Sequence, residues 1–257
     1  MDSYAWSWNA EAIVVLGSTA AYLVSLRRFP APAWRVASFL GAMALLLAVS
    51  VTPIHTLGMH YVLTMHLLQN VVLAEWAPLL LVVGLTPALA ASISLHSVVR
   101  ALTHPLVALP LWLANYMVWH LPWIYDAALR NPSSLLHLEH ALYVVTGVLM
   151  WWCVFQDEPH RLGAGARAAY VFAGFVLASP IGLVMALVPK PIYDFYVDAH
   201  HRVWGLDPLE DQQLAGMLMA LEQALVFFAV FAYWFFRFLL EEERREDVDV
   251  DPPPVAV

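Results

Sequence analysis

The feature that most constrains this chain is a series of seven apolar segments, each 17 or more residues long. They cover residues 10–26, 34–51, 61–84, 105–121, 137–155, 166–188 and 214–240. A helix needs about 20 such residues to cross the hydrocarbon layer of a membrane. Only 12% of the residues are charged, whereas about 25% are charged in a typical soluble domain. We therefore expect an all-α, polytopic membrane protein in which residues 1–240 form one bundle of seven transmembrane helices.

The basic residues are divided unevenly between the two sides of this bundle, with nine on one side and three on the other. Because Lys and Arg accumulate in cytoplasmic loops, the nine mark the cytoplasmic side. The amino terminus is then outside and the carboxyl terminus in the cytoplasm, as an odd number of spans requires. The nine are Arg27, Arg28, Arg35, Arg100, Arg161, Arg167, Arg237, Arg244 and Arg245, and the three are Arg130, Lys190 and Arg202.

Three segments lie between or beyond the spans. Residues 86–104 are expected to form a helix on the cytoplasmic surface, because they combine apolar residues with an arginine. Residues 189–213 are expected to form a long outer loop. Residues 241–257 are charged and then rich in proline, which predicts a disordered cytoplasmic tail.

Pro78 falls inside a span, where we expect a kink whose freed carbonyl group finds a partner on a neighbouring helix.

Eleven histidines are placed unevenly, and eight of them lie at or near the outer side. His66 lies roughly 8 Å below the start of its span, at 1.5 Å per residue. His120 ends the fourth span on the same side, and His137 and His140 share one face of the fifth. Three spans are therefore expected to present imidazoles to one pocket at one depth. The other outer histidines are His55, His60, His200 and His201.

These side chains suit a metal ion. Imidazole binds copper, zinc, iron and haem iron, and the thioethers of Met59 and Met65 would favour Cu(I). Glu139, Asp126 and Tyr125 are candidates for the hydrogen bonds that fix the tautomer of a ligating ring. The alternative interpretation is that each histidine caps a helix or binds water at the membrane interface. The predicted metal ligands are His66, His120, His137 and His140.

Two carboxylates lie well inside the predicted spans, away from their ends: Glu75 near the middle of the third and Glu222 in the last. A bare carboxylate at this depth is costly, so each is expected to be protonated or paired. A role in proton transfer and a neutral packing role are both open. Asn70 lies one turn from His66 on the same helix face and is a candidate partner for it. Cys153, the single cysteine, is expected to pack as a small apolar residue.

Several strings, taken in order, resemble the membrane assembly factors of caa-type cytochrome c oxidases (the CtaG-like family). Each string alone is weakly diagnostic, but their ordered combination is specific, and it covers the chain from about residue 61 to residue 240. The strings are MHLLQN and WAPLLLVVG within residues 65–84, HPLVALPLW from residue 104, WHLPWIYDAAL from residue 119, HLEHALY and WW within residues 137–152, and DPLEDQQLAGMLM from residue 207.

The resemblance implies a seven-span protein of the prokaryotic plasma membrane that is needed to make active haem–copper oxidase. Its cargo would be copper for the catalytic subunit. Its partners would be oxidase subunits, the lipid bilayer and a periplasmic or cell-surface copper carrier. His120 and His140 correspond to histidines of the family, whereas Asn70 stands where the family has the second histidine of its His-x-x-x-His motif.

Other functions fit parts of the same pattern. Two imidazoles can hold haem, in a haem-binding protein or in an accessory subunit retained in a respiratory oxidase complex. Glu75 and Glu222 would suit a proton-coupled transporter, although we find no inverted repeat. A retinal protein is excluded, because the one lysine, Lys190, lies in a loop. The sequence has neither an HExxH pattern nor a basic patch, so we expect neither an enzyme nor a nucleic-acid-binding protein.

Overall fold

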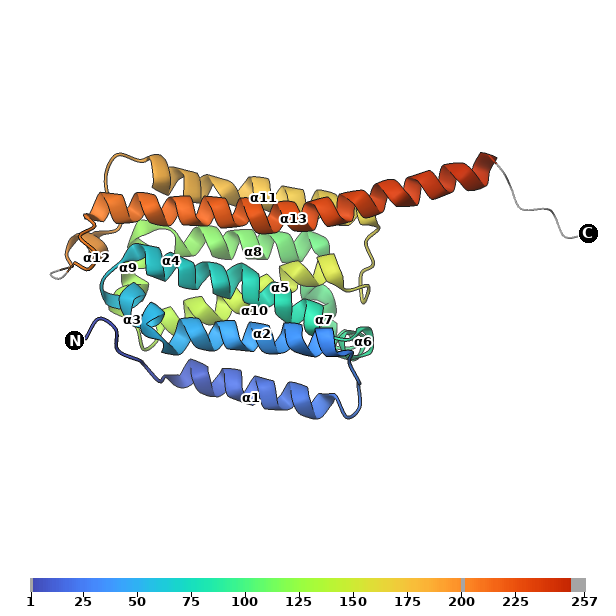
Figure 1. The fold of residues 1–257 in the computed structure, drawn as a ribbon, viewed down its shortest axis with the longest axis horizontal. Helices are drawn as coiled ribbons and strands as arrows, with labels where there is room; N and C mark the ends of the chain where they lie inside the picture. The colour runs from blue at the N-terminus through green and yellow to red at the C-terminus, as the bar shows by residue number, and fades with distance from the viewer. Residues whose placement is uncertain (1, 200–201, 251–257) are drawn as a thin grey trace, which may run out of the picture.

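The computed structural model describes residues 2–199 and 202–250, with side chains as far as residue 245. His200, His201 and the part of the predicted tail beyond residue 250 lie outside the described residues. Every regular element within these ranges is a helix, and the long helices run side by side in one bundle (Figure 1). The prediction of an all-α protein is therefore confirmed.

Each of the seven predicted spans coincides with a helix. Five helical segments of the described chain are long and apolar enough to cross a membrane. The other two, α1 (Ala10–Ser25) and α8 (Pro105–Trp119), are apolar helices of 16 and 15 residues. The five are α2 (Ala33–Val51), the continuous segment of α4 (Leu63–Val71), η1 (Val72–Trp76) and α5 (Ala77–Gly84), then α10 (Leu135–Phe155), α11 (Ala164–Leu187) and α13 (Pro208–Val250).

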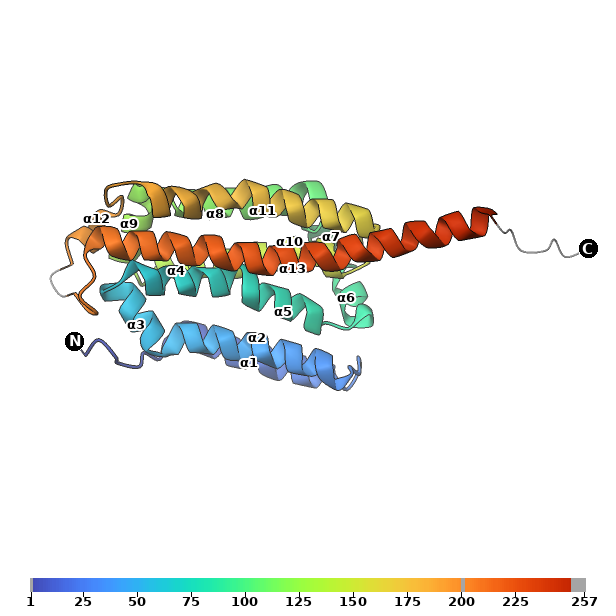
Figure 2. The ribbon, with the colours of Figure 1, turned by 45° about the horizontal axis from the view of Figure 1, so that its top comes forward.

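Short helices lie at the two ends of the bundle (Figures 1 and 2). Residues 86–104 form two of them rather than the single surface helix predicted, because the backbone at His96 is extended, with ψ of 127°. The short helices at one end are α3 (Pro53–His60), α9 (Pro122–Arg130) and α12 (Asp194–Val197), and those at the other are α6 (Pro87–Ile93) and α7 (Ser97–Leu102).

The last helix corrects the predicted tail. α13 continues to Val250, whereas disorder was predicted from residue 241 onward. The added residues are rich in Glu and Arg, which are good helix formers. Arg245 also pairs with Glu242 at 2.7 Å, one turn away, and such pairs stabilise a helix. The end of α13 accordingly projects from the bundle (Figure 1).

A widened helical turn interrupts the third predicted span. Residues Val72–Trp76 form a π-helical turn just before Pro78. Pro78 has no N–H group with which to pair the carbonyl of Ala74, and Trp112 Nε1 of α8 donates to that carbonyl instead, at 3.4 Å. The predicted rescue of the freed carbonyl by a neighbouring helix is confirmed.

Glycines allow the closest contacts between helices. A Cβ at Gly147 of α10 would collide with the carbonyl oxygen of Ala74 and lie 2.7 Å from Pro78 Cγ. Likewise, a Cβ at Gly216 of α13 would lie 2.5 Å from the backbone nitrogen of Ala186 in α11. Small residues let helices pack closely where the surrounding lipid gives no hydrophobic drive for association.

We predict that Gly147→Ala destabilises the protein. The added Cβ has no room beside the π-helical turn, and overpacking of this kind costs about 1–3 kcal/mol. Gly17→Ala is the matched control, because a Cβ at Gly17 has no neighbour within 4 Å and alanine favours a helix. Unfolding in detergent, followed by circular dichroism, measures both variants, and equal stability of the two would contradict the close contact.

Candidate functional site

A group of histidines and carboxylates lies at the end of the bundle that carries α3, α9 and α12. Helices far apart in the sequence supply its members, so the group exists only in the folded chain. We call it the histidine–carboxylate cluster. It consists of Glu11 from the first turn of α1, His55 from α3, His66 from α4, and His137, Glu139 and His140 from α10.

Glu11 connects two of the imidazoles. Its Oε1 accepts a hydrogen bond from Nδ1 of His137 and another from Nδ1 of His140, each at 2.7 Å, while its Oε2 accepts one from Ser50 Oγ at 3.0 Å. An uncharged imidazole that donates from Nδ1 has its lone pair on Nε2. The carboxylate therefore orients both rings and selects the tautomer whose Nε2 can bind a metal ion.

Several imidazole nitrogens of the cluster are buried without a hydrogen-bond partner among the described residues. They are Nε2 of His140 and both ring nitrogens of His66. The ring of His66 is fully buried, and Oε1 of Glu139 lies 3.9 Å from its Nε2, beyond hydrogen-bond distance. A buried polar group left unpaired costs about 1–3 kcal/mol. A ligand bound at these nitrogens would offset that cost.

The rings of His55, His66 and His140 are neighbours. The centroid of His140 is 6.4 Å from that of His66 and 6.5 Å from that of His55. Two imidazoles that share one ion through bonds of about 2.0 Å have centroids about 6 Å apart. Burial and the nearby His140 lower the pKa of His55, which lies outside the predicted spans, to about 4. At neutral pH the His55 ring is therefore uncharged.

His120 is the predicted ligand whose ring contacts tyrosines, Tyr116 and Tyr125, rather than another histidine. It ends α8, where its Nδ1 donates to the carbonyl of Tyr116 at 2.7 Å. The ring of Tyr125 contacts both sides, with its centroid 5.1 Å from that of His66 and 6.2 Å from that of His120. His66, His137 and His140 thus belong to the cluster, and His120, whose Nε2 is also buried without a partner among the described residues, shares with His66 a contact to Tyr125. In the described part of the chain, no three His, Cys, Asp or Glu side chains are arranged to hold a metal ion as they stand.

Two predicted hydrogen-bond roles are different in the structure. Asn70 Nδ2 donates to Glu139 Oε1 at 3.2 Å, so Asn70 positions that carboxyl group rather than His66. Asp126 accepts the backbone N–H of Phe195 at 3.2 Å and anchors the segment between α11 and α13. Burial raises the pKa of Asp126 above its ordinary value. Asp126 therefore stabilises the end of the bundle and does not fix the tautomer of a cluster histidine.

Asp211 of α13 fixes the start of α4, just before His66. Its carboxylate accepts the backbone N–H of Leu63 at 2.6 Å and that of Thr64 at 3.0 Å, and also the hydroxyl of Thr64 at 2.7 Å. The first N–H groups of a helix have no partner within it, and Val62 provides no side-chain cap. A negative charge at this helix end is also favoured by the helix dipole. Asp211 therefore holds the helix that carries His66.

A second polar group lies deeper in the bundle. Gln223 Nε2 donates to Glu75 Oε1 at 2.8 Å and to the Tyr116 hydroxyl at 3.0 Å, while Trp76 Nε1 donates to Glu222 Oε2 at 2.8 Å. All these donors are neutral, and the described ion pairs include neither carboxyl group. Because a bare carboxylate inside a membrane is costly, at least one of the two carboxyl groups is expected to carry a proton. A role in proton transfer stays a prediction.

Sequence reasoning missed the contribution of Glu11 and left His55 outside the predicted ligands. Glu11 had a usable signal, because an acidic residue in the first turn of an apolar helix needs a partner. His55 lies in a segment predicted as a loop that folds instead as α3, and this helix brings its ring to His140.

The fold and the cluster together define a helical membrane protein with a buried histidine–carboxylate site near one end of its bundle. The family model of the cytochrome c oxidase caa3 assembly factor matches residues 20–240, which is most of the chain. The chain belongs to this family of oxidase assembly factors, as the ordered sequence strings predicted. No curated protein and no solved structure showed a significant match.

We predict that Asp211→Asn loosens the start of α4. The amide keeps the size of the side chain but loses its charge and one acceptor, so backbone N–H groups lose charge-assisted hydrogen bonds worth about 1.5–3 kcal/mol. Hydrogen exchange at Leu63 and Thr64 should speed up, and stability in detergent should fall. The control is Glu210→Gln, since Glu210 on the same helical turn accepts a bond only from the exposed N–H of Asp207. Equal exchange rates in both variants would show that Asp211 does not hold this helix.

Proposed function

We propose that this member of the oxidase assembly family holds Cu(I) transiently at the histidine–carboxylate cluster and passes it to the catalytic subunit of a cytochrome c oxidase. The proposed chemistry is ligand exchange, in which one set of donors replaces another on the same ion. It needs no general base and no covalent intermediate. On this proposal the protein is a carrier of its cargo and not an enzyme.

The observation that carries the proposal is the free Nε2 of His140. Glu11 holds the opposite nitrogen of that ring, which is the arrangement of carboxylate, histidine and metal found around ligating imidazoles. The ring of His66 is adjacent, buried and unpaired among the described residues. Cu(I) accepts fewer ligands than most metal ions, so two imidazoles suffice for a first contact. His137 and His55 are further imidazoles beside His140, although Gln69 Nε2 already contacts Nδ1 of His55 at 3.2 Å. His120 also has a buried Nε2 without a partner among the described residues.

The membrane arrangement is part of the proposal. We infer that α1 and α8 also cross the bilayer, which gives seven spans, an outer amino terminus and a cytoplasmic carboxyl terminus. A helix of 15 residues is about 22 Å long, and local thinning of the bilayer accommodates such a short span. The excess of arginine at the end that carries α6 and α7 supports a cytoplasmic position for that end.

With this orientation the cluster lies near the outer face of the plasma membrane. Copper would then arrive from a periplasmic or cell-surface carrier and leave to an oxidase subunit in the same bilayer. The partners and the location come from the family and from the apolar helices. The copper itself is inferred from the imidazole donors, which suit copper among other metals, and from the oxidase that the family serves.

We predict that the purified protein binds about one equivalent of Cu(I) and that the double variant His66→Ala, His140→Ala loses this binding. The reason is that these two rings provide the adjacent free nitrogens. Competition titration with a Cu(I) chelator measures the affinity. His96→Ala is the control, because His96 is exposed at the opposite end of the bundle. If the double variant binds Cu(I) as the parent does, the cluster is not the site.

The same variants distinguish the family role from the copper role in cells. A strain that carries only the double variant should make less active oxidase, and the oxidase should contain less copper. Loss of oxidase without loss of its copper would favour an assembly role that does not involve the metal. An optical spectrum of the purified protein tests the haem alternative, since a Soret band would assign the histidines to haem.

We predict that Glu11→Gln weakens Cu(I) binding about 10- to 100-fold, as expected when a residue that orients a ligating histidine is changed. Glutamine keeps the shape of the side chain but is a poorer acceptor for two imidazole N–H groups, so His137 and His140 lose their common anchor. Ser50→Ala serves as the control, since it removes only the bond from Ser50 to Glu11. Unchanged affinity in Glu11→Gln would mean that Glu11 is structural.

A further inference from the structure

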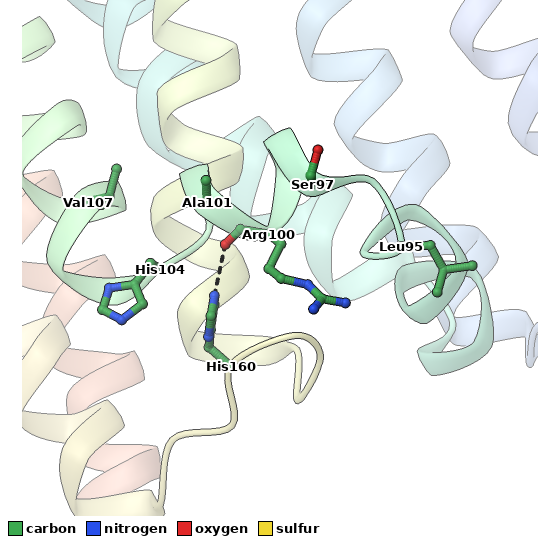
Figure 3. A pocket seen from close by; sticks show the side chains of 7 residues that line it. All are labelled: Leu95, Ser97, Arg100, Ala101, His104, Val107 and His160. Atoms are coloured by element: carbon green, nitrogen blue, oxygen red, sulfur yellow. Dashed lines mark hydrogen bonds between the residues drawn. The ribbon is translucent and has the colours of Figure 1, made fainter.

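A pocket of about 540 Å³ opens at the end of the bundle opposite the histidine–carboxylate cluster. The segment between α6 and α7, α7 itself, the start of α8 and the connection from α10 to α11 all contribute to it. Figure 3 shows the side chain of Arg100 extending between His160 and Leu95. A cavity of this size lies within the range of about 300–1,000 Å³ that holds small ligands. The polar side chains that line it are Ser97, Arg100, His104 and His160.

Local hydrogen bonds arrange these side chains as donors. His160 Nε2 donates to the carbonyl of Arg100 at 2.8 Å, which ties the two walls of the pocket together (Figure 3). His104 Nδ1 accepts the backbone N–H of Leu106 at 3.3 Å, so its Nε2 carries the hydrogen that can be donated to a ligand. The rings of His104 and His160 are in edge contact, with centroids 4.9 Å apart. The pocket therefore offers a ligand the guanidinium of Arg100 and the Nε2–H of His104, whereas the Nε2–H of His160 is already used.

The charge of the pocket is positive. Its lining contains no acidic residue, and Arg100 is not part of any ion pair in the described chain. The acidic side chain of Asp157, on the connection from α10 to α11, is already paired with Arg161 and Arg167. An unpaired guanidinium in an open pocket matches the geometry of a phosphate group, with which it forms two parallel hydrogen bonds.

The rim of the pocket is strongly apolar. Leu95, which lines the pocket, is 77% exposed, and Val98 of α7 and Leu106 of α8, each next in sequence to a lining residue, are 66% and 81% exposed. Contact with this apolar rim would not strengthen the binding of a water-soluble phosphate. Acyl chains would cover it, and a surface segment of short helices with leucine, valine and arginine is the kind that lies at the boundary between headgroups and hydrocarbon.

We propose that this pocket binds the headgroup of an anionic phospholipid from the adjacent leaflet. Arg100 pairs with the phosphodiester, His104, whose ring lies across His160 from Arg100 in Figure 3, donates to another part of the headgroup, and the acyl chains lie along Leu95 and Val107. Basic pockets between helices on the cytoplasmic side of membrane proteins bind anionic lipids in this manner. The site is separate from the copper cluster, so it stands or fails independently of the proposed cargo.

The test is native mass spectrometry of the full chain, delipidated in detergent and titrated with phosphatidylglycerol or with phosphatidylcholine. We expect tighter binding of phosphatidylglycerol, because its headgroup carries a net negative charge, whereas that of phosphatidylcholine has no net charge. Arg100→Gln should weaken phosphatidylglycerol binding about fivefold, as expected for loss of one arginine at a lipid phosphate, and leave phosphatidylcholine binding unchanged. Circular dichroism should show the same helix content, since the Arg100 side chain is exposed.

The matched control is Arg28→Gln, an exposed arginine outside this pocket, and it should bind phosphatidylglycerol as the parent does. Equal weakening by Arg28→Gln and Arg100→Gln would overturn the proposal, because it would show diffuse attraction to a basic surface. Equal binding of the two lipids would overturn it as well. Displacement of the lipid by an equal concentration of inorganic phosphate would assign the pocket to a soluble anion instead.

Discussion

The structure depends on one constraint: inside a hydrocarbon layer, a polar group has no water to pair with and must find its partner within the protein. Hydrogen bonds within each helix pair most of its backbone N–H and C=O groups. Where such a group has no partner within its own helix, a side chain from another helix pairs with it. Trp112 donates to the carbonyl that Pro78 leaves free, and Asp211 accepts the first N–H groups of α4. These bonds join α8 and α13 to the segment formed by α4, η1 and α5. The side chains that pair with unsatisfied backbone groups therefore also determine how these helices pack.

The same constraint explains why unpaired nitrogens in the histidine–carboxylate cluster favour the binding of a ligand. Buried imidazole nitrogens without partners are costly, and the bundle places several of them near one another. Glu11 pairs with one nitrogen of His140 and leaves the other free, which is a useful arrangement only if something binds there. Neutral donors hold Glu75 and Glu222 within the bundle. One oxygen of each carboxyl group, Glu75 Oε2 and Glu222 Oε1, is also buried without a partner among the described residues.

The two ends of the bundle differ in chemistry. The cluster end combines imidazoles with carboxylates, and imidazole donors suit a transition-metal cation such as copper when the rings are uncharged. The opposite end presents an unpaired guanidinium beside apolar side chains, which suits an anionic amphiphile. An assembly factor must keep its orientation in the membrane while it meets a partner in the same bilayer. Lipid contacts at one end and cargo at the other would serve these two requirements separately.

The sequence alone determined the helical class, the positions of seven apolar helices and the family, because apolar length and ordered local strings are properties of the chain itself. It also predicted that His66, His120 and His140 lie at one depth, since rise per residue is constant along a helix. Only the tertiary structure decided that Glu11 joins His137 to His140, that Tyr125 contacts both His66 and His120, and that Asn70 serves Glu139. Depth follows from position along one helix, whereas the direction in which a ring points depends on how each helix is rotated against its neighbours. Close helix contacts, such as those at Gly147 and Gly216, contribute to that rotation. The sequence does not show that these glycines influence the site.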